Sequence, residues 1–230
     1  MNLLLRKIKG IISVFSVCLV FTLVAGYSTQ WGLYQSTDGK EIDFIIDAGH
    51  GMPDGGAVAA DGTTEQQLNL AIAQKLHAAL NKNGAGTLMI REDESSVYSE
   101  GESIHAKKVS DIKNRVKLAK EFPDIPLISI HMNSYPDESV YGLQVFYKSG
   151  DEVSKKIATD IQTAINEKIQ PQNPKTIKTI SPNVYLFSHI ENPSILIECG
   201  FLSNPKELND LKSAEYQDKL ANVIADCLVS

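Results

Sequence analysis

Short apolar runs alternate with amphipathic helical segments along most of the chain. Four runs have the β-branched and aromatic content of buried strands, at residues 44–46, 87–90, 127–131 and 194–201. Weaker patterns predict two further strands, at 141–147 and 184–187. Helical spacing of apolar residues covers about 64–83, 107–121, 151–169 and 214–228, and a short helix begins at Asn204-Pro205. This alternation predicts a single α/β domain with a mostly parallel central sheet flanked by helices.

Local signals set several boundaries of these elements. Thr64 and Gln67 are spaced as the N-cap and N3 partners of a capping box, and Asn83-Gly84 ends the same helix. The helix over 151–169 is expected to turn Val153, Ile157, Ile161 and Ile165 inward, and the helix over 107–121 Ile112, Val116 and Ala119. Residues 92–106, which include His105, and the proline-rich stretch 171–183 are expected to be loops.

The N-terminal segment has the pattern of a targeting signal. Residues 1–9 carry three positive charges and no acid, and residues 11–25 are uncharged and mostly apolar. Residues 1–26 are therefore predicted to be a signal peptide or a membrane anchor. Residues 27–42 are interpreted as a linker and residues 43–230 as the single folded domain. Any membrane contact is expected through residues 1–26 alone, with the domain outside the cytoplasm.

Charge and cysteine content argue against two classes of protein, nucleic-acid-binding proteins and disulfide-rich folds. The net charge of -6 argues against a nucleic-acid partner, which would require a basic surface. Cys18 lies in the apolar N-terminal run, and Cys199 and Cys227 are too few for a disulfide framework. We expect these last two to be buried apolar side chains and not a bridge.

Ionisable residues stand at the ends of three predicted strands. His50, His131 and Glu198 each follow an apolar run, and glycines flank His50. Carboxyl ends of parallel strands share one edge of a sheet, where open α/β folds bind their ligands. Glu65 adds a second carboxylate at the start of the first helix, although a glutamate there can also serve only the helix dipole. Two histidines and a glutamate are a known ligand set for catalytic zinc, with a further acid free to take a proton.

The segments that carry these residues resemble the zinc-dependent N-acetylmuramoyl-L-alanine amidases. The matching stretches are Ile46 to Gly51 with Gly56-Ala57, Glu65 with Leu68 to Leu70, Ser129 to Asn133, and Ile197 to Asn204. They follow the family's order and span most of the predicted domain. One departure is Ile90-Arg91, where the family usually has Thr-Arg, and another is the long polar loop that follows.

The resemblance implies a function and a role for each matched residue. It implies Zn²⁺ held by His50, Glu65 and His131, with Glu198 as the catalytic acid–base. It also implies cleavage of the peptidoglycan amide between the muramoyl lactyl group and L-alanine. Arg115 and Asn133 are the expected substrate-binding residues, with local packing as the other role for Arg115. The short form is similar to the spore-cortex, germination-specific subgroup, which implies secretion to the cell wall or forespore envelope and leaves room for an activator protein.

Two other functions fit parts of the pattern. A peptidoglycan-binding module of the same fold would need no Glu198. A metal-free glycosidase would use a carboxylate pair such as Asp47 and Glu198, and it leaves His50 and His131 unexplained. His189, just beyond the run at 184–187, is the rival metal ligand.

Overall fold

Residues 41–230 are the part of the chain that the computed structural model describes. The strands are β1 (Phe44–Ala48), β2 (Thr87–Met89), β3 (Leu127–Asn133), β4 (Gln144–Tyr147), β5 (Lys178–Thr179) and β6 (Ser194–Phe201). The helices are α2 (Glu65–Lys82), α3 (Ile104–Lys120), α4 (Glu152–Lys168), α5 (Tyr185–Ser188), α6 (Pro205–Lys212) and α7 (Ala214–Leu228). The predicted targeting segment 1–26 and most of the predicted linker lie outside the described residues.

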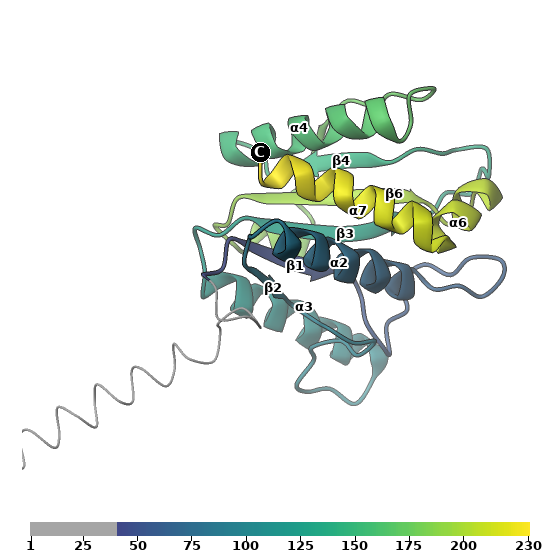
Figure 1. Cartoon of the computed structure of the whole chain (residues 1–230). Helices are drawn as coiled ribbons and strands as arrows, with labels where there is room; N and C mark the ends of the chain where they lie inside the picture. The colour runs from purple at the N-terminus through teal and green to yellow at the C-terminus, as the bar shows by residue number, and fades with distance from the viewer. Residues whose placement is uncertain (1–40) are drawn as a thin grey trace, which may run out of the picture.

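The strands form one six-stranded sheet in the order β2-β1-β3-β6-β4-β5 (Figure 1). Pairing is parallel from β2 through β1 and β3 to β6, and β4 runs antiparallel to β6. The prediction of a mostly parallel sheet flanked by helices is therefore confirmed. As a result, β1, β3 and β6 all end at one edge of the sheet, and β4 begins there.

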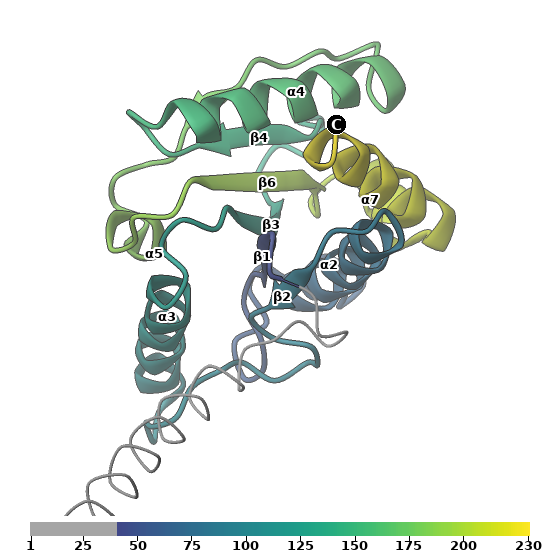
Figure 2. The same cartoon turned by 60° about the vertical axis from the view of Figure 1, so that its left-hand side comes forward.

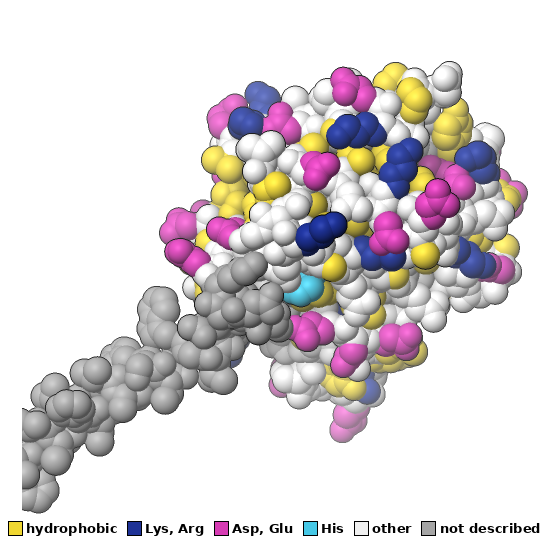
Figure 3. Space-filling model, in the orientation of Figure 1, with side chains coloured by type: hydrophobic (Ala, Val, Ile, Leu, Met, Phe, Trp, Pro, Cys, Tyr) yellow, Lys and Arg dark blue, Asp and Glu magenta, His cyan; other side chains and the backbone are white. Residues whose placement is uncertain are grey.

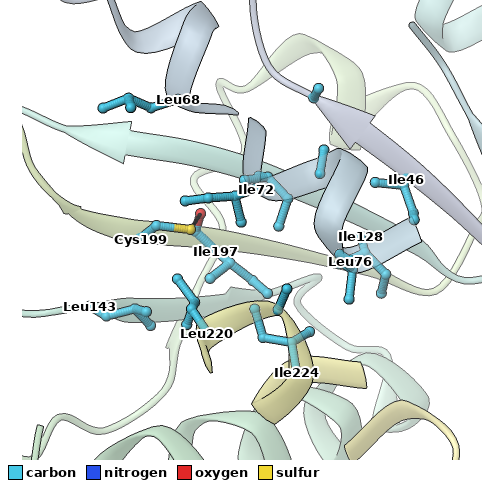
Figure 4. Packing of buried hydrophobic residues seen from close by; sticks show 14 of the residues in the cluster. Ile46, Leu68, Ile72, Leu76, Ile128, Leu143, Ile197, Cys199, Leu220 and Ile224 are labelled. Atoms are coloured by element: carbon cyan, nitrogen blue, oxygen red, sulfur yellow. Dashed lines mark hydrogen bonds between the residues drawn. The ribbon is translucent and has the colours of Figure 1, made fainter. Parts of the chain in front are cut away.

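Alternating side chains of the central strands pack into two cores, one on each face of the sheet. Ile46, Ile128 and Ile197 point to one face, where α2, α4 and α7 cover them (Figure 4). Ile45, Leu127 and Leu196 point to the other face, which α3 and α5 cover (Figure 2). Because strand side chains alternate, Asp47, Ser129, His131 and Glu198 lie on the α3/α5 face.

The predicted boundaries of α2 agree with the structure. The Thr64 N–H donates to Gln67 Oε1 at 3.2 Å, as in a capping box. The helix ends at Lys82, and Gly84 follows with a φ of 95°. Glu65 therefore opens a well-anchored helix, and its side chain is buried.

Three expectations about secondary structure and one about burial were wrong. Residues 184–187 do not form a strand, because Tyr185–Ser188 is the one-turn helix α5; four apolar residues cannot distinguish the two states by periodicity. The predicted loop 171–183 contains β5, a two-residue edge strand. Helix α3 begins at Ile104, so that His105 is helical; Ser103 caps it by accepting from the Ala106 N–H at 3.1 Å. Val153, in the first turn of α4, was expected to face inward but is 52% exposed.

Cysteines and surface charges agree with an ordinary folded domain. Cys199 is buried, Cys227 is partly buried, and both are free thiols, which confirms that they form no bridge. Cys199 packs in the core on the face opposite to Glu198. Acidic and basic side chains are interspersed over the face formed by α2, α4 and α7 (Figure 3). Among residues 41–230, no helix is both long and apolar enough to cross a membrane.

Candidate metal centre

Four ionisable side chains meet at the edge where the parallel strands end. His50 follows β1, His131 lies near the end of β3, and Glu198 pairs with His131 across the β3–β6 ladder. Glu65 comes to the same place as the first residue of α2. The sequence placed these residues at strand and helix ends, and the topology brings those ends together.

His50, Glu65 and His131 present their donor atoms to one small space. His50 Nε2 lies 3.1 Å from Glu65 Oε2, and His131 Nδ1 lies 2.9 Å from Glu65 Oε1. One ligand atom from each of the three residues lies within 4.8 Å of the other two. This is the only such group of three or more metal-ligating side chains within residues 41–230. The arrangement can hold a metal ion.

Glu65 is fixed on both of its carboxylate oxygens. The Ala57 N–H donates to Oε2 at 3.0 Å, and the Met132 N–H donates to Oε1 at 3.3 Å. Burial alone would raise its pKa, but hydrogen bonds from His131 and His50 hold the pKa of Glu65 well below its usual value. The glutamate is therefore an anion at neutral pH, the state that a metal ligand requires.

His50 is oriented by a carboxylate on its far side. Its Nδ1 lies 2.9 Å from Asp54 Oδ2, so that Nε2 faces Glu65. A carboxylate behind a metal-ligating histidine sets the tautomer and the ring orientation in this way. Burial disfavours the charged imidazole, but hydrogen bonds to Asp54 and Glu65 outweigh it and raise the pKa of His50 to about 9. A metal ion binding here therefore displaces a proton.

Glycines make the space that the ligands occupy. A Cβ added at Gly49 would lie 2.1 Å from His131 Nε2 and 2.2 Å from its Cε1, so that the imidazole covers this residue. A Cβ added at Gly56 would lie 2.5 Å from Glu65 Oε2. His50 itself has a φ of 60°, a left-handed conformation that non-glycine residues adopt rarely and mostly where function requires it.

Glu198 differs from Glu65 in having a buried oxygen without a partner. Its Oε2 is inaccessible and accepts no hydrogen bond from any described residue. Burial, with a smaller contribution from the charge of Glu65, raises the pKa of Glu198, although His131 opposes the shift. A carboxylate in this state can exchange a proton with a group that enters the site.

Arg115 lies beneath the metal centre and is almost fully buried. Its guanidinium donates to Asp47 Oδ1, to Asp111 Oδ2 at 2.9 Å, and to the carbonyls of Ala48 and His50. Ser129 completes the cluster by donating to Asp47 Oδ2 at 2.6 Å. Packing is thus a role that Arg115 already performs, and substrate binding by this residue stays a prediction.

Two buried residues that sequence reasoning missed support the same loop. Asn69 Nδ2 donates to the Gly49 carbonyl at 3.0 Å, and Arg91 Nη2 donates to the same oxygen at 3.0 Å. Asn69 also lies 3.4 Å from Glu65 Oε1. Its position one turn after Glu65 on α2 was the available signal, since residues four apart share a helix face. Asp54 was missed as well, although it follows His50 by four residues.

A cavity of about 350 Å³ opens beside His50 and His131. Its opposite wall comes from α3 and α5 and includes His105, Lys108 and Phe187. Asn133 is not part of this wall, and its Oδ1 accepts from the Ser134 N–H at 2.8 Å. His189 stacks on Tyr185 at the surface, with 3.8 Å between ring centroids, and is not one of the three clustered residues.

Comparison with known proteins decides the family. The model of the N-acetylmuramoyl-L-alanine amidase family matches residues 44–230. The chain belongs to this family. It is therefore an amidase that acts on peptidoglycan, and the resemblance inferred from its motifs is confirmed.

Individual relatives agree with this assignment. The amidase is 36% identical over 195 residues to the germination-specific N-acetylmuramoyl-L-alanine amidase of Bacillus subtilis, covering 84% of this chain and 79% of that protein. Its fold matches the CwlD amidase of Clostridioides difficile, solved in complex with the GerS lipoprotein, with a TM-score of 0.76 and 35% identity, covering 80% of this chain and 95% of that one. An N-acetylmuramoyl-L-alanine amidase of Clostridium difficile 630 gives a TM-score of 0.69 at 29% identity, covering 81% and 94%.

Proposed function

We propose that the chain is a zinc-dependent amidase that cleaves the bond between the muramoyl lactyl group and L-alanine in peptidoglycan. His50, Glu65 and His131 hold the metal, and Glu198 is the general acid–base. The observation that carries the proposal is the convergence of three donor atoms within 4.8 Å, two of them on histidines that line a cavity.

The donor set fits zinc on chemical grounds. Two imidazoles and one carboxylate leave a fourth position for water, as catalytic zinc sites require. Asp54 behind His50 and the backbone N–H groups on Glu65 supply the outer hydrogen bonds that orient such ligands. A zinc ion bound there would activate water and polarise the amide carbonyl.

Glu198 is placed to move the proton. Its raised pKa makes it a stronger base than an exposed glutamate, and its free oxygen has no competing donor among the described residues. It would accept a proton from the attacking water and return it to the departing alanine amine. Cys199, the next residue along β6, points into the opposite core and takes no part.

Both alternative functions lack support at this site. A binding module does not need a buried carboxylate without a partner beside a metal site. A glycosidase pair of Asp47 and Glu198 would require a free Asp47. That carboxylate accepts from Arg115 and Ser129, and both it and Arg115 are 2% exposed.

Product analysis tests the proposal. The zinc-loaded chain should release new alanine amino groups from purified peptidoglycan and no new reducing ends. A chelator should abolish this release, and added zinc should restore it. New reducing ends, or amine release that persists after complete metal removal, would overturn the assignment.

We also propose that the domain acts outside the cytoplasm, in the cell wall or the envelope of a developing spore. The identity to a germination-specific relative and the pattern of residues 1–26 support this location. Deleting residues 1–26 should leave the zinc-dependent activity of the remaining chain unchanged, because those residues carry only a targeting pattern. Loss of activity in the folded, zinc-loaded deletion variant would show that the segment belongs to the catalytic unit.

An accessory protein forms part of the proposal. The CwlD amidase of Clostridioides difficile was solved in complex with the GerS lipoprotein. By analogy, we propose that an extracytoplasmic partner binds this chain and adjusts its activity. The test is to express the chain together with candidate lipoproteins and to measure its rate on peptidoglycan. A rate that is the same with and without each of them would contradict the proposal of such a partner.

A further inference from the structure

A second cavity, larger than the one beside the metal centre, lies at the same edge of the sheet. Its volume is about 510 Å³, within the range of small-molecule sites. It is bounded by the segment before β4, the end of α4, and the helices α6 and α7. Figure 1 places the first three of these on the side of the molecule where β3 and β6 end.

The strand register connects this cavity with the catalytic edge. Gln144, the first residue of β4, pairs with Glu198 on β6. Tyr141 and Gly142 line the cavity and precede Gln144 by only two or three residues. At about 3.3 Å per extended residue, the lip of the cavity lies roughly 10 Å along the chain from the level of Glu198. The cavity lies toward α4 and α7, whereas His131 and Glu198 lie on the α3/α5 face, so that only a polymeric substrate that crosses this edge of the sheet can reach both places.

The lip carries an aromatic ring on a fixed backbone. Tyr141 is 48% exposed, and its carbonyl accepts from Asn173 Nδ2 at 2.9 Å. Gln170 clamps the neighbouring Leu143 twice, since its Oε1 accepts from the Leu143 N–H at 2.7 Å and its Nε2 donates to the Leu143 carbonyl at 2.9 Å. An exposed ring on a rigid segment loses little freedom when a ligand stacks on it.

The charges of the lining disfavour an anionic ligand. Lys206 is the only basic side chain in the lining, and it pairs with Asp210 at 2.7 Å. Glu207 adds another carboxylate, whose oxygens accept from the N–H groups of Gly142 and Phe201 at 3.0 and 2.8 Å. The stem peptide of peptidoglycan carries free carboxylates, so that this lining would repel it.

The remaining polar groups suit a neutral ligand rich in hydroxyl and amide groups. Gln172 supplies a side-chain amide and Asn173 an amide oxygen, whereas the amide of Asn204 is engaged by the N-terminus of α6 and by the Glu138 carbonyl. Tyr216 is partly buried at the wall, and no described residue forms a hydrogen bond with its hydroxyl. Amide side chains, an unpaired phenol and an exposed aromatic ring together match the polar edges and the apolar face of a sugar ring.

We propose that this cavity binds an N-acetylated amino sugar of the glycan strand, away from the muramoyl unit whose amide is cleaved. The proposal rests on the chain acting on peptidoglycan. It gives the enzyme a second hold on polymeric substrate, separate from the metal centre, and makes Tyr141 a residue that determines affinity for long glycans.

Binding of the tetrasaccharide of N-acetylglucosamine to the full-length, zinc-loaded chain tests this proposal, because this probe contains no muramoyl amide. Calorimetric titration should detect binding to the wild type, and Tyr141→Ala should weaken the affinity roughly 3- to 10-fold. Tyr135→Ala is the matched control, since Tyr135 is also exposed and lies outside the lining. Tyr216→Phe, which removes only the hydroxyl, should weaken the affinity by a smaller factor.

Three results would overturn the proposal: no binding by the wild type, equal binding by Tyr141→Ala, or preferential binding of a free stem tripeptide in the cavity. Kinetics separate this failure from failure of the amidase assignment. Tyr141→Ala should raise KM on polymeric peptidoglycan and leave the hydrolysis of a single muramoyl-peptide unit unchanged. Absence of alanine amine release by the wild type from any substrate would instead refute the amidase assignment.

Discussion

Two charged clusters lie next to each other on the α3/α5 face of the sheet, and they differ in how their charges are satisfied. Asp47 and Arg115 are 2% exposed, and hydrogen bonds engage both carboxylate oxygens of Asp47 and each guanidinium nitrogen of Arg115. The second cluster lies closer to the edge where the strands end. The side chains of His50 and His131 are about a quarter exposed there, and Glu198 has an oxygen without a partner among the described residues. The first cluster is complete within the protein. The second leaves one buried carboxylate oxygen, Glu198 Oε2, without a partner in the part of the chain that the structure describes.

The difference shows what each cluster does for the enzyme. Closed buried ion pairs hold backbone in place, and Arg115 does so by binding the carbonyls of Ala48 and His50. We call the cluster of Asp47, Arg115 and Ser129 the closed cluster and that of His50, His131 and Glu198 the open cluster. Ionisable groups that are left without full pairing, as in the open cluster, are typical of functional sites. Variants of the open cluster should therefore lose activity without unfolding, and variants of the closed cluster should lose stability first.

The largest effect on turnover is expected for Glu198→Gln. The amide keeps the size of the side chain but cannot accept the proton of water, so that kcat should fall roughly 10²- to 10⁴-fold. Zinc content and thermal stability should remain those of the wild type. Glu191→Gln, an exposed glutamate shortly before β6, is the matched control and should retain full activity. Wild-type kcat for Glu198→Gln would remove this residue from the chemistry.

A smaller effect is expected for Gly49→Ala, which probes the space beneath His131. The added methyl group would lie within 2.6 Å of three imidazole atoms, so that the ring must leave its present position beside Glu65. Zinc affinity, measured by competition with a chromogenic chelator, should fall roughly 10- to 100-fold. Gly55→Ala is the control in the same loop, since its Cβ would meet only Thr64 Cγ2 at 3.4 Å. Equal zinc affinity for both variants would mean that the position of His131 does not limit binding.

The closed cluster is tested by Asp47→Asn. Burial raises the pKa of Asp47, but the charges of Arg115 and His131 and the hydrogen bonds from Ser129 and Arg115 together outweigh burial and hold the pKa below the usual value. The carboxylate therefore stabilises the fold above its unfolded pKa of about 3.9, and this contribution is lost as the pH falls through the lower folded pKa. At pH 7 the variant should lose about 3 kcal/mol of unfolding free energy, and the deficit should shrink in acid.

Urea denaturation at several pH values measures this deficit. Asp218→Asn is the control, because Asp218 forms only an exposed ion pair with Lys75 and its removal should change stability little. A deficit for Asp47→Asn that is equally large at all pH values would show that shape, and not charge, holds the closed cluster together.

The sequence predicted the open cluster better than the closed one. His50, His131 and Glu198 stand at the ends of apolar strands, so that parallel topology alone brings them to one edge. The closed cluster depends on contacts across 68 positions between Arg115 and Asp47 and across 82 between Ser129 and Asp47. No local pattern marks such partners.

The secondary-structure errors have a related cause. Residues 184–187 would be apolar in either conformation. Leu186 and Phe187 pack into the core and line the cavity, and this tertiary packing favours the helix. The first residue of α3 could not be predicted, because its N-cap Ser103 lies in a polar run with several serines and no local signal shows which of them caps the helix. The long apolar run of β6 was predicted at its observed bounds, Ser194–Phe201, whereas the weaker pattern at 141–147 begins as a strand only at Gln144.

The most direct test of the central claim compares bound zinc in Glu65→Ala and Glu198→Gln after identical loading of the full chain. Glu65→Ala leaves two histidines, too few for a stable catalytic zinc site, and should be metal-poor and inactive. Glu198→Gln should keep the zinc content of the wild type and lose turnover. Reversed zinc contents would exchange the two roles, and zinc with full activity in both variants would contradict the account.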